Sequence, residues 1–206
     1  MTARLRVKVC GVTRLADAEA CVDAGVDLVG LNFVVGSPRR VDEATARALA
    51  VALRGRVEVV GVVAGGEEAS LRRLAREVGL DRLQLHGDEP AALVAALGAL
   101  AWKAVRIGDA GDVARARAFG GDVIVVDAKV EGALGGTGRR VDPALVRDLA
   151  ACRAVLLAGG LAPGNVAEAV RAVRPWGVDV ASGVEVSPGV KDARAIAAFV
   201  VAARAA

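Results

Sequence analysis

Arg6-Val-Lys-Val-Cys10-Gly11-Val-Thr-Arg14 is the stretch that decides the fold. Basic and apolar residues alternate as far as Cys10, which is typical of a strand, and Gly11 breaks the pattern before a helical segment begins. A strand that passes through a short loop into a helix is the start of a βαβ unit. Ligands of parallel sheets and barrels bind where such loops gather, so Cys10 is expected at the functional edge.

The same strand–helix alternation continues to the end of the chain. Strands are predicted at Arg6–Cys10, Asp27–Val34, Glu58–Val63, Arg82–Leu85, Ala101–Val105, Val123–Asp127, Ala154–Leu157 and Val178–Ala181. Helices are predicted at Leu15–Ala24, Glu43–Leu53, Glu67–Val78, Pro90–Leu97, Gly111–Phe119, Pro143–Ala150, Pro163–Val173 and Asp192–Ala203. Eight such units close into a barrel. The sequence therefore predicts an α/β protein, a single-domain (β/α)8 TIM barrel over residues 1–206.

An open, doubly wound sheet is the alternative fold. Such a sheet often carries a G-x-G-x-x-G turn after its first strand, and residues 10–14 lack it. The length of 206 residues is somewhat short of the typical barrel of about 250 residues. No linker or low-complexity stretch interrupts the series of units, so no domain boundary is predicted.

Composition limits the environment and the partners. Hydrophobic residues make up 54% of the chain and the mean hydropathy is +0.45. The longest uncharged run, 154–167, is still well under the roughly 18 apolar residues of a spanning helix. The first strand begins too early for a secretory signal, so a cytoplasmic protein without membrane contact is expected. Strands covered on both faces account for the apolarity.

The charged, aromatic and thiol residues point the same way. The 27 basic and 24 acidic residues are interspersed, and three Phe, two Trp and no Tyr offer little stacking surface, so no nucleic-acid partner is predicted. A small anionic ligand fits this balance. Three cysteines without metal-site spacing favour a reducing compartment, with Cys21 and Cys152 expected as buried apolar residues. Oligomeric state is not predicted.

Glycine-rich segments follow the sixth, seventh and eighth predicted strands. They are residues 132–138, the run around Gly159 and Gly160, and the run around Ser182 and Gly183. In barrels the loops after strands seven and eight bind phosphate, because bare backbone exposes N–H donors there. Glycines that only permit tight turns are the alternative interpretation. Their occurrence in both of the expected loops favours a phosphate site.

The histidine and serine residues of the chain argue against two classes of enzyme. A single histidine, His86, excludes a multi-histidine metal site, and no G-x-S-x-G elbow for a serine nucleophile occurs. His86 is equally compatible with a ligand contact and with a purely structural role. No metal or cofactor is predicted.

The groups left at the expected ligand edge include a thiol and several charges. A thiol and a carboxylate at strand ends can move protons without a cofactor. A core cysteine and a capping aspartate are the alternative interpretations of Cys10 and Asp127. For Arg39 the alternative is a solvated loop charge, and for Asp179 a buried polar group satisfied by neighbouring amides. Lys8 is expected inside the barrel and is not predicted to act on Cys10. The groups at the edge are Cys10, Asp127, Asp179, Lys129 and Arg39.

Seven motifs in order resemble those of the phosphoribosylanthranilate isomerase family of tryptophan biosynthesis. They span nearly the whole chain, which makes the resemblance specific although each motif alone is weak. The motifs are Lys8-Val-Cys10-Gly11-Val-Thr13, Ser37-Pro-Arg39-Arg-Val41, Gln84-Leu-His86-Gly-Asp-Glu-Pro90, Val126-Asp127-Ala-Lys129, Gly135-Gly-Thr-Gly138, Leu157-Ala-Gly159-Gly160-Leu-x-Pro-x-Asn165-Val166 and Asp179-Val-Ala-Ser182-Gly183-Val-Glu185, followed by Pro188-Gly189 and Lys191-Asp192.

The resemblance implies an Amadori rearrangement. Asp127 would be the general acid that protonates the ribose ring oxygen, and Cys10 the general base that removes the C2′ proton. Arg39 would bind the anthranilate carboxylate and Asp179 would lie at the substrate. The loops with Gly159, Gly160, Ser182 and Gly183 would bind the phosphate.

Two segments depart from the family pattern. Val63-Ala64-Gly65 stands where Phe-Val-Asn is usual, and Val141-Asp142-Pro143 where Phe-Asp-Trp is usual. Other functions compatible with the fold are a different sugar-phosphate isomerase or epimerase and a barrel that only binds a phosphorylated metabolite. Metal-dependent epimerases need several histidines, and a pure binder needs neither a thiol base nor a carboxylic acid.

Overall fold

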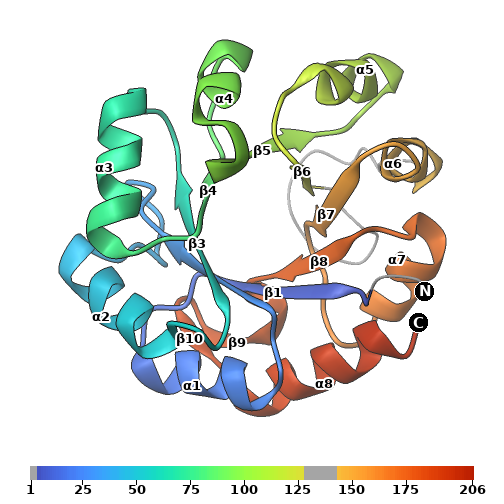
Figure 1. Ribbon diagram of the computed structural model, residues 1–206. Coiled ribbons are helices and arrows are strands. Elements are labelled where there is room, and N and C mark those ends of the chain that lie inside the picture. The colour runs from blue at the N-terminus through green and yellow to red at the C-terminus, as the bar shows by residue number, and fades with distance from the viewer. Residues whose placement is uncertain (1–3, 128–142) are drawn as a thin grey trace.

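The computed structural model describes residues 4–127 and 143–206, and shows a closed parallel barrel ringed by helices (Figure 1). The barrel strands are β1 Arg6–Cys10, β2 Leu28–Asn32, β3 Glu58–Val63, β4 Arg82–Leu85, β5 Ala101–Arg106, β6 Val123–Asp127, β7 Ala154–Ala158 and β8 Gly177–Val180. They are hydrogen-bonded in sequence order, and β8 closes on β1. The predicted (β/α)8 fold is confirmed.

The helices follow the strands as predicted. They are α1 Leu15–Asp23, α2 Glu43–Leu53, α3 Glu68–Val78, α4 Ala91–Leu97, α5 Ala110–Ala118, α6 Pro143–Ala150, α7 Val166–Val173 and α8 Ala193–Arg204, with 3-10 turns η1 Gly98–Leu100 and η2 Ser182–Val184. None of the described helices has the length and apolarity to cross a membrane. Three features of the sequence lie outside the described residues. They are the candidate Lys129, the glycine-rich segment 132–138, and residues 141 and 142 of the segment that departs from the family pattern.

Local chemistry explains where elements differ from the expected bounds. β2 ends at Asn32 instead of Val34 because the Asn32 side chain accepts a hydrogen bond from the Val34 N–H at 2.8 Å, which turns the chain. α7 begins at Val166 instead of Pro163, since Asn165 holds the preceding loop through the Ala162 N–H. Asp42 caps α2 by accepting from the Thr45 N–H at 2.7 Å.

A two-stranded hairpin after β8 was not predicted. β9 Glu185–Ser187 and β10 Val190–Lys191 pair antiparallel ahead of α8. Gly189 occupies the left-handed region at φ 82°, which permits the tight turn between them. The hairpin lies beside α1 and the end of β1 (Figure 1), so it can contact the catalytic edge expected from the sequence.

Two apolar clusters form the core among the described residues. The larger lies between strands and helices, and includes the fully buried Cys21. The smaller consists of Leu28, Val60, Trp102, Val123, Val125 and Leu156. Because alternate strand residues share a face, Val123 and Val125 point the same way as Asp127. The barrel interior is thus apolar toward the amino ends of the strands and polar toward their carboxyl ends. Cys152 is exposed, so its expected burial was wrong.

Candidate active site

Cys10 lies at the carboxyl end of β1, half-buried at the barrel mouth. A glycine on the neighbouring strand makes room for it. A Cβ atom on Gly30 would lie 2.9 Å from the Cys10 Sγ and 3.2 Å from the Lys8 Nζ. The thiol and the ammonium therefore share the space that a side chain at Gly30 would fill.

Lys8 is fully buried inside the barrel, as expected, and it is also a neighbour of Cys10, a contact that the sequence does not predict. Strand register places it beside Asp179 of β8. Its Nζ donates to Asp179 Oδ2 at 2.8 Å and to Gln84 Oε1 at 3.0 Å. Burial alone would lower the pKa of Lys8, but the Asp179 carboxylate and Cys10 outweigh it and raise that pKa. Lys8 is thus a permanent cation beneath the thiol.

Asp179 is buried within the barrel. The family resemblance implies that this residue lies at the substrate. Its Oδ2 is bound by Lys8, whereas its Oδ1 is buried and has no hydrogen-bond partner among the described residues. A buried carboxylate oxygen without a donor is costly, so this atom is suited to accept a hydrogen bond from a ligand.

Burial and the charges around the thiol together decide the pKa of Cys10. Burial raises the pKa of Cys10 above its ordinary value, and Asp179 acts in the same direction. Lys8 and Lys191 oppose this effect by stabilising the thiolate. The two buried ammonium groups are therefore what makes a thiolate attainable at this position.

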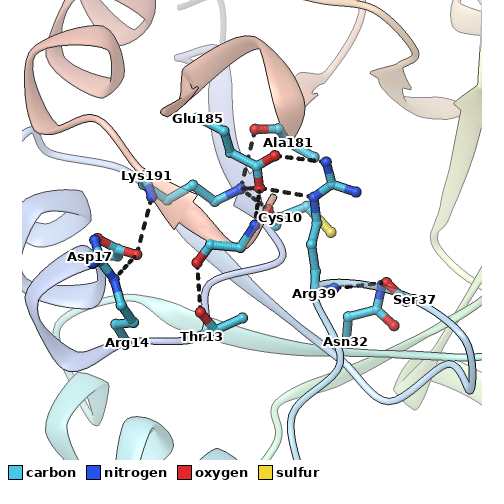
Figure 2. Close-up of polar contacts among 11 residues, drawn as sticks. Cys10, Thr13, Arg14, Asp17, Asn32, Ser37, Arg39, Ala181, Glu185 and Lys191 are labelled. Carbon is cyan, nitrogen blue, oxygen red and sulfur yellow. Dashed lines mark hydrogen bonds and ion pairs between the residues drawn. The ribbon is translucent and has the colours of Figure 1, made fainter. Parts of the chain in front are cut away.

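Lys191 of β10 ties the strand ends together (Figure 2). Its buried ammonium donates to the backbone carbonyl oxygens of Cys10 at 2.6 Å and Ala181 at 3.1 Å. It also pairs with Glu185 of β9 at 2.8 Å. Its backbone N–H reaches the Asp17 carboxylate of α1. The hairpin thus fixes the backbone that carries Cys10.

Arg39 lies in the loop after β2 and is oriented by the same hairpin (Figure 2). Its Nε and one terminal nitrogen donate to the two carboxylate oxygens of Glu185 at 2.8 and 2.6 Å. Ser37 holds the loop, since its hydroxyl accepts from the Arg39 N–H. A guanidinium has five donors, so the edge formed by its two terminal nitrogens remains available for a second carboxylate.

Asp127 ends β6 and is half-buried. In the closed barrel β6 is separated from β1 by β7 and β8 on one side, so Asp127 and Cys10 lie on opposite sides of the mouth. Asp127 and His86 both line a cleft of about 560 Å³ next to β4, β5 and β6. The structure therefore brings His86 to the ligand edge.

Glu89 organises the loop that carries His86. Its two oxygens bind the Lys103 ammonium at 2.9 Å and the backbone N–H groups of Gly65 and Gly87 at 2.8 and 3.0 Å. Gly65 belongs to the segment that departs from the family pattern. The carboxylate of Glu89 thus joins the loops after β3 and β4 through the backbone N–H of Gly65, whose φ of 75° favours glycine.

The two glycine loops expected to bind phosphate are packed against each other. Gly159 and Gly160 have φ angles of 96° and 67°, which favour glycine. Asn165 closes their loop by donating to the Gly160 carbonyl at 3.0 Å. A Cβ on Gly183, next to Ser182, would overlap the Leu161 carbonyl oxygen. Only glycine allows this backbone contact between the loops after β7 and β8.

Comparison with known proteins decides the family. The model of the N-(5′-phosphoribosyl)anthranilate (PRA) isomerase family matches residues 7–202. The chain belongs to this family. An N-(5′-phosphoribosyl)anthranilate isomerase of Myxococcus xanthus is 50% identical over 204 residues, covering 97% of this chain and 96% of the relative. The expected isomerase of tryptophan biosynthesis is confirmed.

Solved structures agree with this assignment to the PRA isomerases. Phosphoribosyl anthranilate isomerase of Thermotoga maritima superposes with a TM-score of 0.87 at 38% identity, covering 98% of this chain and 100% of that one. A second structure, with a TM-score of 0.84 at 36% identity and the same coverage, is a complex with reduced 1-(o-carboxyphenylamino)-1-deoxyribulose 5-phosphate.

Several polar residues of this isomerase site were missed by sequence reasoning. In the sequence, Glu185 and Lys191 stand out only as parts of motifs, and Lys8 is predicted only to lie inside the barrel. The available signal was the placement of Lys8 and Cys10 on one strand face. Which charges oppose them depends on strand register and on the unexpected hairpin.

Proposed function

We propose that Cys10 and Asp127 carry the proton transfers by which this chain isomerises N-(5′-phosphoribosyl)anthranilate. The observation that supports these roles is their position on opposite sides of one barrel mouth. One group can then act at the ribose ring oxygen and the other at C2′ of the same sugar. Neither step needs a covalent bond between substrate and protein.

The reaction balances without an external reactant. Asp127 donates a proton to the ring oxygen while the C1′–O bond breaks and the anthranilate nitrogen lone pair forms a C1′=N bond. The Cys10 thiolate removes the C2′ proton, and the C–H electrons form a C1′=C2′ bond as the iminium becomes an amine. The enolamine then gains a proton at C1′, and the C2′ hydroxyl loses its own proton. The result is the ketone 1-(2-carboxyphenylamino)-1-deoxyribulose 5-phosphate.

Lys8 and Lys191 support the base by the charge they hold near it. Because the reaction uses a thiolate, we place the enzyme in the reducing cytoplasm, working as one domain over residues 1–206. The substrate is a small phosphorylated molecule.

Arg39 is proposed to bind the anthranilate carboxylate through its remaining edge. Arg39→Lys should raise KM about 10- to 100-fold with a smaller change in kcat, because a lysine cannot hold Glu185 and a ligand carboxylate in one plane. Steady-state kinetics check this. Arg40→Lys is the matched control, since Arg40 is exposed in the same loop. Equal KM values for both variants would remove Arg39 from the substrate site.

The phosphate is proposed to bind at the backbone of Gly159, Gly160, Ser182 and Gly183. Gly183→Ala should raise KM and lower the free energy of unfolding by about 1–3 kcal/mol, since its Cβ would push apart the two loops. Urea unfolding and steady-state kinetics measure the two effects. Gly164→Ala is the control, because a Cβ there meets no atom within 4 Å. If Gly183→Ala behaved like this control, the packed-loop site would be wrong.

The function itself is tested on the unmodified protein. We expect the fluorescence of N-(5′-phosphoribosyl)anthranilate to disappear with saturable kinetics, at a kcat within the usual enzyme range of about 1–10³ per second. The product should appear in equal amount by chromatography. Tight binding of the substrate without product formation would instead indicate a barrel that only binds a phosphorylated metabolite.

A further inference from the structure

A chain of buried side chains crosses the barrel from β8 to the end of β4. Asp179 accepts from the Lys8 ammonium at 2.8 Å, and that ammonium donates to Gln84 Oε1 at 3.0 Å. The Gln84 Nε2 lies 3.2 Å from Nδ1 of His86. Lys8, Gln84 and Asp179 are each at most 6% exposed, so water does not replace these partners.

The chemistry of each group fixes the direction of the hydrogen bonds. An ammonium only donates, so the Gln84 oxygen must face Lys8. The Gln84 amide nitrogen, which only donates, is then left for His86. Nδ1 of His86 must therefore accept, and in a neutral ring the proton lies on Nε2.

The surroundings of His86 keep the ring neutral. Burial lowers its pKa, and the cations Lys8 and Lys103 act in the same direction, against the carboxylates Asp127 and Asp179. His86 also lines the cleft that contains Asp127. The ring therefore belongs to the mouth of the barrel, while its Nδ1 is held from inside.

We propose that Lys8 and Gln84 are positioning residues that hold His86 as the neutral Nε2–H tautomer, so that the ring donates a hydrogen bond to an oxygen atom at the active site. The charge of Asp179 keeps Lys8 in the orientation that starts the chain. The role in turnover rests on the proposed function, whereas the tautomer does not depend on it. A histidine with its lone pair on Nε2 would accept a proton there instead of donating.

The test uses the fact that this chain contains one histidine. A long-range ¹H–¹⁵N spectrum of the uniformly ¹⁵N-labelled full chain reports both ring nitrogens of His86 without ambiguity. We expect an unprotonated Nδ1 and a protonated Nε2 at neutral pH. A protonated Nδ1, or an equal mixture of tautomers, in the unmodified protein would overturn the proposal.

If the contacts from Lys8 through Gln84 set the tautomer of His86, Gln84→Glu should reverse it. A carboxylate only accepts, so it would bind Lys8 with one oxygen and require a donor at Nδ1 of His86 with the other. We expect Nδ1 to become protonated and kcat to fall, with a melting temperature near that of the unmodified protein. Arg82→Lys, on the same strand outside the chain of contacts, should leave the spectrum unchanged.

Lys8→Met provides a second variant in case Gln84→Glu does not fold. Without the ammonium the Gln84 amide can rotate, so we expect a mixture of His86 tautomers. An unchanged tautomer in a folded Gln84→Glu or Lys8→Met variant would contradict the proposal. A switched tautomer with unchanged kcat would contradict the positioning role. Failure of the unmodified protein to turn over substrate would affect the proposed function alone.

Discussion

Cys10→Ser should lose about 10²- to 10⁴-fold in kcat, because positioned proton transfer contributes that much to an enzymatic rate. A serine hydroxyl keeps nearly the size of the thiol, but it is far less acidic, so the nearby Lys8 and Lys191 cations do not stabilise it as an anion the way they stabilise the thiolate. Substrate binding should change little, since no carboxylate or phosphate contact is assigned to the thiol. Steady-state kinetics with the fluorescent substrate measure both parameters.

If the Cys10 thiolate is the base, kcat/KM of the unmodified protein should rise with pH. Burial raises the pKa of Cys10, so the thiolate is the minor form at low pH and its fraction grows as pH increases. The flanking groups Lys8, Lys191 and Asp179 set where this rise occurs. Cys10→Ser should abolish it. Cys21→Ser, which changes a buried thiol away from the mouth, is the control and should keep the pH profile. Full turnover by Cys10→Ser would exclude the thiol as base.

Asp127→Asn should lose about 10²- to 10⁴-fold in kcat, since an amide cannot donate its proton to the ring oxygen as a carboxylic acid does. The fold should persist, because Asp127 is half-buried at a strand end and the shape of its side chain is kept. Circular dichroism and urea unfolding verify this. Asp122→Asn, at the exposed residue directly before the first residue of the same strand, is the matched control. Equal kcat values for the two variants would remove Asp127 from the reaction.

The fold could be predicted from the sequence because its signals are local. Alternation of residues 6–10, the continuous apolar run before Asp127 and the caps of the helices all depend on neighbours in the chain. The loops of the predicted phosphate site were also visible, because glycine at Gly159, Gly160 and Gly183 marks backbone that must be bare.

The charged contacts around Cys10 could not be predicted in the same way. Lys8 meets Asp179 across 171 positions of sequence, through the register of β1 and β8. Lys191 reaches the Cys10 carbonyl over 181 positions, from a hairpin whose strands are too short to show an alternating pattern. Sequence reasoning found the two residues that are proposed to move protons, but not the charges that tune and orient them.

The division of roles between Cys10 and Asp127 is tested most directly by substrate that carries deuterium at C2′. The rates of both variants are compared with deuterated and ordinary substrate in single turnovers. Removal of the base makes C–H cleavage limiting, so Cys10→Ser should show a primary isotope effect clearly above one. Loss of the acid makes ring opening limiting, so Asp127→Asn should show an effect close to one. The reverse pattern, or no effect in Cys10→Ser, would contradict the assignment of Cys10 as the base that removes the C2′ proton.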